Sequence, residues 1–247
     1  MNTAETPNAC GLKREDFQTT IDGKRTELFI LKNNAGSEVA ITNYGGALVA
    51  IMVPDRNGNF SNIIQGHDNI KDVIASPEPY LSTLIGRYGN RIAKGKFQLN
   101  GKGYELFVNN GPNSLHGGKQ GWNAKVWDAI QMNSHELSLT YVSPYGEEGY
   151  TGEVKCHVTY TLTEDNELVI NYLASSNKRT ILNLTSHGFF SLAGIADPTP
   201  TIDNLLCEIN ADFYLPIDET SIPTGEILKV AGTPFDFRTQ KAVGKDI

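Results

Sequence analysis

The residues best suited to chemistry lie in two stretches of the chain, each of which contains a histidine. The first stretch opens with Gly86-Arg-Tyr-Gly-Asn-Arg-Ile92 and runs on to His116 in Pro112-Asn-Ser-Leu-His-Gly-Gly118. Nine glycines fall between Gly86 and Gly121. Glycine allows the backbone to turn through positive φ and allows a ligand to approach the main chain closely. Arginine, asparagine and histidine set among such turns indicate a rigid polar pocket and not a packed core.

The second histidine is His187, in the stretch Asn183-Leu-Thr-Ser-His-Gly-Phe-Phe190. An imidazole titrates near neutral pH, so it can give or accept a proton there at small cost. Asn90 and Arg91 add directional hydrogen-bond donors. Two imidazoles with this pair suit acid–base chemistry on an uncharged, hydroxylated ligand. The competing interpretation is that His116 caps a turn and that His187 is a hydrogen-bonded core histidine.

Other chemistries find less support in the sequence. His67, His135 and His157 are expected at the surface. No His-x-His or His-x-x-x-His spacing occurs, so a two-histidine metal site is a weak hypothesis. Neither a G-x-S-x-G motif nor a P-loop is present, which removes the support for a serine hydrolase or a nucleotide-binding protein. Aspartates and glutamates are scattered through the chain, so a glycosidase with paired carboxylates stays open.

The elements that must position these residues are short strands separated by turns. Asp22-Gly23, Asn57-Gly58 and Asn100-Gly101 are strong hairpin signals because both turn residues accept positive φ. One short helix is expected over residues 68–75, with Asp68 as its N-cap. Strands are expected at Val126 to Gln131, His135 to Val142, Val154 to Leu162 and Leu168 to Leu173. The absence of helical periodicity predicts a mainly antiparallel β protein, with two large sheets packed together.

The alternation of side chains along a strand also orients His187. In the expected strand from Ile181 to His187, Leu182, Leu184 and Ser186 point one way. His187 then shares the opposite face with Asn183 and Thr185, which are polar. We therefore expect His116 and His187 to converge, with Asn90 and Arg91, on one open cleft. Strands are expected again at Leu205 to Ala211 and at Phe213 to Ile217.

Composition limits the possible partners. The 247 residues are expected to form a single β-sandwich domain over 1–247, with residues 1–10 as a flexible tail. A net charge of −7 argues against a nucleic-acid partner. No run approaches the ~18 apolar residues of a membrane helix, and no signal peptide is visible. Cys10, Cys156 and Cys207 are odd in number and suggest no disulfide framework. A cytoplasmic monomer is expected.

Four motifs, taken together and in order, carry a resemblance to a known family. They are Gly86-Arg-Tyr-Gly-Asn-Arg-Ile-Ala93, Asn113-Ser-Leu-His-Gly-Gly118 with Gly121-Trp122, Thr185-Ser-His-Gly-Phe-Phe-Ser-Leu-Ala-Gly194, and the tail Leu215-Pro-Ile-Asp-Glu-Thr-Ser-Ile-Pro-Thr-Gly-Glu226 with Thr233-Pro-Phe-Asp-Phe-Arg238. The sequence resembles the aldose 1-epimerase (galactose mutarotase) family over residues 11–247. The resemblance implies a large antiparallel β-sandwich, the galactose mutarotase-like supersandwich, with the sugar in an open cleft.

The resemblance also implies roles for particular residues. Asn90 and Arg91 match the positions that hold sugar hydroxyls. His116 matches the histidine that hydrogen-bonds the sugar near its ring oxygen and anomeric hydroxyl, so it is expected to be catalytic together with His187 as well as sugar-binding. His187 matches the general acid, with Gly188 and Phe189 beside it. Many relatives carry tyrosine where this chain has Phe189, so that hydroxyl contact is expected to be missing. Trp122 stands where phenylalanine is more usual.

The implied reaction is the interconversion of the α and β anomers of free aldohexoses such as glucose or galactose, which makes the protein an isomerase. Opening and reclosing the ring needs an acid and a base but no metal or organic cofactor; a structural cation such as Ca²⁺ is compatible with the sequence. The free monosaccharide is the expected partner, with no nucleic acid and no membrane.

One part of the family pattern has no match in this sequence. The resemblance places a glutamate base and a sugar-holding aspartate beyond Ile247, so the chain is expected to be C-terminally incomplete. It is then expected to show little mutarotase activity and low stability on its own. Glu219 and Glu226 belong to a motif that the family also has, so neither is assigned as the base. Two alternatives stay open: a non-catalytic carbohydrate-binding β-sandwich, and a structural domain associated with a glycosidase.

Overall fold

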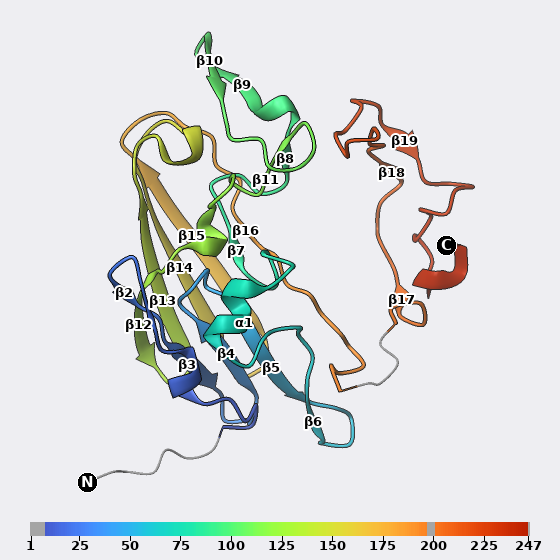
Figure 1. Cartoon of the computed structure of the whole chain (residues 1–247). Coiled ribbons are helices and arrows are strands. Elements are labelled where there is room, and N and C mark those ends of the chain that lie inside the picture. Colours follow the sequence, from blue (N-terminus) through green and yellow to red (C-terminus); the bar gives the residue numbers. More distant parts are fainter. Residues whose placement is uncertain (1–7, 197–200, 247) are drawn as a thin grey trace.

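Two four-stranded antiparallel sheets form the body of the protein (Figure 1), in a computed structural model that describes residues 8–196 and 201–246. The first sheet has the order β3-β4-β5-β6 and the second the order β12-β13-β14-β15. Their bounds are Leu28–Lys32 (β3), Glu38–Thr42 (β4), Leu48–Pro54 (β5), Phe60–Asn62 (β6), Asp128–Asn133 (β12), Glu136–Ser143 (β13), Val154–Leu162 (β14) and Leu168–Ser176 (β15). Every strand pairs with its neighbour in sequence, so each sheet is a meander.

The main hydrophobic core draws on both sheets. Its buried members include Leu31, Val39, Ile41, Leu137, Leu139, Cys156, Val158 and Tyr160, together with Trp122 and Trp127. Along β14 the burial alternates residue by residue, because successive side chains point to opposite faces of a strand. The expected antiparallel β-sandwich is therefore confirmed, and β14 has the predicted bounds.

Some element boundaries differ from the sequence prediction. β12 begins at Asp128 and not at Val126, because the two preceding residues bond elsewhere: Val126 bridges Tyr44, and the Trp127 amide donates to Asn43 O at 2.9 Å. β15 continues to Ser176, three residues further than expected. Helix α1 spans Ile70–Ala75, and its N-cap is Asn69, whose side-chain oxygen accepts from the Asp72 amide at 3.0 Å. Asp68 is therefore not the cap.

Shorter elements accompany the two sheets. All three predicted hairpin turns are present: β1 (Thr20–Ile21) pairs with β2 (Lys24–Arg25), β5 pairs with β6 across Asn57-Gly58, and β9 (Lys96–Leu99) pairs with β10 (Lys102–Glu105). The 3₁₀ turns are η1 (Arg14–Phe17), η2 (Ala93–Gly95), η3 (Trp122–Ala124), η4 (Glu147–Gly149) and η5 (Val243–Asp246). Residues 1–7 of the expected flexible tail lie outside the described ranges. The Ala9 amide donates to Glu38 Oε2 at 2.6 Å.

Residues 201–246 lie to one side of the two sheets and form two short ladders (Figure 1). β17 (Leu206–Cys207) pairs with β20 (Lys241–Ala242), and β18 (Phe213–Tyr214) pairs with β19 (Leu228–Lys229). The longer strands expected at 205–211 and 213–217 shrink to these pieces, because each finds a partner at only two positions. Among the described residues, no helix is long and apolar enough to cross a membrane.

Candidate functional site

Both histidine stretches are fixed to one short segment, residues 84–92. Its first half, β7 (Leu84–Ile85), pairs antiparallel with β16 (Thr185–Ser186), the strand that leads into His187. Its second half, β8 (Arg91–Ile92), pairs with β11 (Ser114–Leu115), the strand that leads into His116. One segment of nine residues therefore sets the spacing of two histidines that lie 71 positions apart in the sequence.

The two imidazoles meet directly. The centroids of the His116 and His187 rings are 5.0 Å apart, and the ring planes are nearly perpendicular, at 89°. Phe189 stacks on the other histidine of the pair, His187, with centroids 5.0 Å apart and an interplanar angle of 23°. The structure thus brings together the two histidines that the sequence singled out, and it adds an aromatic neighbour to the second.

His116 is locked to Asn90 by two reciprocal hydrogen bonds. The His116 amide donates to Asn90 O at 3.1 Å, and the Asn90 amide donates to His116 Nδ1 at 3.0 Å. Both residues have positive φ, 52° for His116 and 65° for Asn90, which is uncommon outside glycine and concentrates at functional sites. Because Nδ1 accepts a backbone N–H, the neutral ring carries its proton on Nε2. His116 is therefore built as a hydrogen-bond donor.

The surroundings of His116 also keep it uncharged. The residue is 8% exposed, and burial, followed by the nearby charges of His187 and Arg91, lowers its pKa from 6.5 to about 4. A ring with this pKa is neutral at pH 7. Protonation of Nδ1 would also break the bond from the Asn90 amide. Electrostatics therefore keeps the ring neutral, and the hydrogen bond from the Asn90 amide selects its tautomer.

Asn90 and Arg91 support each other beside the histidine. The Asn90 side-chain oxygen accepts from the Arg91 backbone amide at 2.8 Å and from Arg91 Nη1 at 3.4 Å. The Arg91 Nε group donates to Asn110 Oδ1 at 2.9 Å. The guanidinium is therefore held at the same end of the 84–92 segment as His116, close enough to lower the pKa of that ring.

His187 is held mainly through its backbone. Its amide donates to Thr83 O at 2.8 Å, and its carbonyl accepts from the Ser82 amide at 3.1 Å. Gly188 follows at a point where a Cβ would come within 2.5 Å of the Phe190 ring, so a larger residue would displace that ring. The Phe189 amide donates to Ser82 Oγ at 3.2 Å. The stretch from His187 to Phe189 is therefore bonded along its length to the loop before β7.

The strand before His187 follows the predicted alternation only in part. Leu184 packs against the main core, whereas Leu182 is 37% exposed. Asn183 turns to the 84–92 segment: its amide donates to Arg87 O at 2.9 Å and its side chain to Gly89 O at 2.9 Å. Regular pairing shrinks to β16, because Asn183 bridges Tyr88 in parallel and not as part of an antiparallel ladder.

Beneath the site, glycines let three backbones pass close together. A Cβ at Gly117 would overlap the carbonyl oxygen of Gly86, and a Cβ at Gly86 would overlap the Trp122 ring. Trp122 is 2% exposed, packs edge-on against Trp127 and donates its amide to Gly86 O at 3.2 Å. Trp122 therefore packs beneath the 84–92 segment at Gly86. The glycine-rich sequence is thus explained by close approach of backbones at these positions.

Arg87 anchors the same segment from below. Its guanidinium is 1% exposed and donates to Ser143 Oγ at 2.8 Å, Thr151 O at 2.9 Å, Ser143 O at 3.0 Å and Pro144 O at 2.8 Å. The Ser143 hydroxyl in turn donates to Glu147 in a very short hydrogen bond. A serine hydroxyl therefore links the buried cation to the Glu147 carboxylate. Arg87 acts as an anchor, and Arg91 is the arginine that faces the histidines.

Sequence reasoning missed Tyr80. Its ring lies edge-on to His116 at 4.6 Å between centroids and roughly parallel to His187 at 6.3 Å. It follows Pro77-Glu-Pro79, a loop without periodicity. The signal that could have revealed it is an aromatic residue placed after two prolines in an otherwise polar loop.

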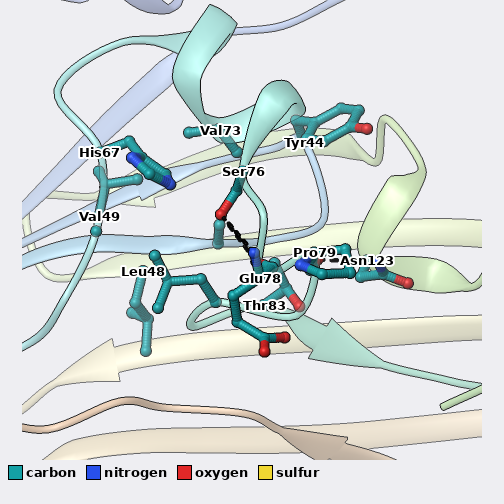
Figure 2. Close-up of a pocket in the computed structure, with 13 residues that line it drawn as sticks. Tyr44, Leu48, Val49, His67, Val73, Ser76, Glu78, Pro79, Thr83 and Asn123 are labelled. Carbon is teal, nitrogen blue, oxygen red and sulfur yellow. Dashed lines mark hydrogen bonds between the residues drawn. The ribbon is translucent and has the colours of Figure 1, made fainter. Parts of the chain in front are cut away.

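Another difference concerns His67, which was expected at the surface. It lines a pocket beneath α1 together with Val49, Val73 and Thr83 (Figure 2), and its Nε2 is buried without a hydrogen-bond partner. The cavity measures about 10 Å³, close to the room that one water molecule needs and far too small for a monosaccharide. Within residues 8–196 and 201–246, no group of three or more His, Cys, Asp and Glu residues could hold a metal ion.

Comparison with known proteins places this arrangement in context. The family model described as aldose 1-epimerase matches residues 27–247. Galactose mutarotase from Sus scrofa is 46% identical over 209 residues, which are 85% of this chain and 60% of that protein. Galactose mutarotase from Homo sapiens is 42% identical over 225 residues, 91% of this chain and 64% of that protein. The chain thus spans less than two thirds of the length of these curated relatives.

Solved structures show the same fold. A GalM/aldose epimerase homologue from C. elegans superposes with a TM-score of 0.83 at 30% identity, covering 90% of this chain and 67% of that one. Galactose 1-epimerase from Lactobacillus acidophilus gives a TM-score of 0.81 at 32% identity, with 92% and 65% covered. The expected supersandwich is therefore confirmed.

Proposed function

The chain belongs to the aldose 1-epimerase family, and we propose that it carries the acid and the sugar-binding residues of an isomerase that interconverts the α and β anomers of free aldohexoses such as glucose and galactose. The observation that carries this proposal is the perpendicular pair of imidazoles, 5.0 Å apart, in which the tautomer of one ring is fixed.

The reaction requires two proton transfers. A base removes the proton of the C1 hydroxyl, an acid protonates the ring oxygen, and the C1–O5 bond breaks to give the open aldehyde. After rotation about C1–C2, the C5 hydroxyl attacks the other face of the aldehyde, and the two protons return. Each positioned acid or base contributes on the order of 10²–10⁴-fold.

Two histidines in different environments can divide these tasks. We assign the acid role to His187, which is half-buried at the end of β16. His116 takes the complementary role of neutral donor, because Nδ1 is occupied by the Asn90 amide and only Nε2 has a proton to offer. A donor that does not release its proton can hold a sugar oxygen in place without competing with His187 for the acid step.

The remaining residues of the proposed site bind the sugar. Asn90 and Arg91 offer amide and guanidinium donors to its hydroxyls. Gly188 leaves room beside His187, and the Phe189 ring, stacked on His187, offers an apolar surface without a hydroxyl. None of these assignments needs a metal or an organic cofactor. The proposal assigns no base and covers only the acid and the sugar-binding half of the reaction.

We further propose that the chain folds as one domain and works as a cytoplasmic monomer with a free monosaccharide as its partner. Three observations support this proposal: the main core draws on both sheets, all three cysteines are free thiols, and the net charge of −7 disfavours nucleic acid.

Polarimetry tests the proposed activity. The optical rotation of freshly dissolved α-D-galactose or α-D-glucose is followed with the protein and with His187→Ala, in the presence and absence of formate as an external base. We expect the protein to accelerate mutarotation more than His187→Ala does, most clearly with formate. Identical rates for the two proteins under both conditions would refute the assignment of His187 as the acid.

A further inference from the structure

Tyr80 makes more ring contacts within the proposed site than any other residue outside the sequence motifs. It touches both histidines: its ring centroid lies 4.6 Å from that of His116, at an angle of 62°, and 6.3 Å from that of His187, at 30°. Aromatic pairs prefer such edge-on or offset arrangements. Among the residues that the structure describes, Tyr80 is therefore the one ring that contacts both His116 and His187.

The loop that carries Tyr80 is held firmly from below. Asn123 donates to Pro79 O at 3.0 Å, and the Ser76 hydroxyl oxygen accepts from the Glu78 amide at 3.3 Å; both contacts are visible around the pocket in Figure 2. The Tyr80 amide donates to Glu78 Oε1 at 3.1 Å, and its carbonyl accepts from both the amide and the hydroxyl of Thr83 at 3.2 Å. Thr83 is also the residue that binds the His187 amide.

The hydroxyl end of Tyr80 reaches the loop that carries His116, through Asn109. The side-chain oxygen of Asn109 accepts from the Leu115 amide at 2.7 Å. Its side-chain nitrogen donates to Gly118 O at 2.9 Å, to Leu115 O at 3.0 Å and, more weakly, to Tyr80 Oη at 3.3 Å. Asn109 thus holds the turn on both sides of His116, an arrangement that we call the Asn109 clamp. Tyr80 contacts this clamp through its hydroxyl oxygen.

We propose that Tyr80 is a positioning residue of the proposed site, whose ring, together with the Asn109 clamp, fixes the His116 imidazole and keeps water away from it. This inference rests on the proposed function, but the experiment that tests it does not measure mutarotation. In this arrangement the Asn90 amide determines which nitrogen of His116 carries the proton. Tyr80 holds the ring in the position from which the Nε2 proton can be donated to a sugar oxygen.

The environment of His116 agrees with this role. Burial is the largest cause that lowers its pKa, ahead of the charges of His187 and Arg91, which are the titratable groups that act on it. Tyr80 contributes to that burial as an uncharged phenol, since burial and Glu78 both raise the pKa of Tyr80. Removing the ring admits water to His116, and a better solvated imidazole accepts a proton more readily.

Histidine-selective NMR titration tests the proposal without any sugar. The His116 pKa is measured in the wild-type chain, in Tyr80→Leu, in Tyr80→Phe and in the control Tyr145→Phe, an exposed tyrosine whose ring contacts Lys178. We expect Tyr80→Leu to raise the His116 pKa from about 4 toward 6.5, whereas Tyr80→Phe, which keeps the ring, and Tyr145→Phe leave it low. An unchanged pKa in a folded Tyr80→Leu variant overturns the proposal.

Asn109→Ala decides the question if Tyr80→Leu does not fold. Asn109 is exposed, so its replacement leaves the hydrophobic core intact. Asn57→Ala, in the exposed turn before β6, is its control. We expect Asn109→Ala to raise the His116 pKa and Asn57→Ala to leave it unchanged; no rise in Asn109→Ala overturns the proposal. Because no step depends on mutarotation, a failure here is distinguishable from a failure of the polarimetric test.

Discussion

Replacing Gly117 by alanine tests whether the crossing of backbones beneath His116 holds the site together. Gly117 has φ +95°. A Cβ there would overlap the carbonyl oxygen of Gly86 and would come within 2.7 Å of its carbonyl carbon, closer than the 3.0 Å that real Cβ atoms respect. Both obstacles are main-chain atoms, so no side chain can rotate away to relieve the overlap. The backbone of the 84–92 segment or of the His116 turn has to move.

Two contributions set the expected loss of stability. Placing an L-residue in the left-handed region costs about 1–2 kcal/mol. Forcing extra volume into a packed contact costs about 1–3 kcal/mol more. The free energy of unfolding of Gly117→Ala is therefore expected to fall by about 2–5 kcal/mol, which for a chain of this size lowers Tm by about 2–4 °C per kcal/mol.

Gly101→Ala is the matched control, because it shares the conformational cost but not the overlap. Gly101 has φ +75° in the β9–β10 turn, and a Cβ there meets nothing within 4 Å. We expect it to lose only about 1–2 kcal/mol. The measurement is urea unfolding followed by tryptophan fluorescence, with both variants and the wild type under the same conditions. If Gly117→Ala loses no more stability than Gly101→Ala, the close approach of Gly117 to Gly86 is not a structural constraint and our reasoning is wrong.

Three further predictions concern the histidines and the buried arginine. In a protein with mutarotase activity, His187→Ala should lower kcat by on the order of 10²–10⁴-fold, measured by polarimetry, and an unchanged kcat would remove it from the acid role. Because the pKa of His116 falls from 6.5 to about 4 on folding, the unfolded chain takes up a proton at His116 at a higher pH than the folded chain does. The stability that depends on an uncharged His116 is fully present above pH 6.5, and up to about 3 kcal/mol of it is lost as the pH falls toward 4. The free energy of unfolding of His116→Asn should therefore depend less on pH in that window. Arg87→Met should cost about 3–5 kcal/mol in urea unfolding, because it leaves buried acceptors unpaired; the exposed Arg238→Met is the control, and equal small losses would contradict the anchoring role.

Periodicity and turn chemistry predicted most of the sandwich. β14 alternates over nine residues, and Asp22-Gly23 and Asn100-Gly101 form the expected hairpin turns, because local residue types decide both features. The C-terminal part, residues 201–246, was predicted less well. The expected strand from Leu205 to Ala211 is reduced to β17, since a strand needs a partner and propensity alone supplies none.

For the candidate site, the sequence could single out residues in local motifs but could not predict contacts between distant segments. The resemblance named His116, His187, Asn90 and Arg91, and the structure brings the two rings and Asn90 into direct contact. Nothing in the sequence could fix the tautomer of His116, because that depends on a backbone amide 26 positions away. Tyr80 escaped for the same reason: its contacts with the two histidines follow from loop packing and not from spacing along the chain.

The central claim, that His116 and His187 form one monosaccharide-binding site, is tested most directly by titrating the chain with D-galactose and following its histidine imidazole signals by NMR. Two other histidines, His135 in the turn between β12 and β13 and His157 on β14, serve as internal controls. We predict that the His116 and His187 signals shift together with a single Kd, while the His135 and His157 signals stay in place. Shifts confined to the control histidines, or no shift at either site histidine at saturating galactose, would contradict the claim.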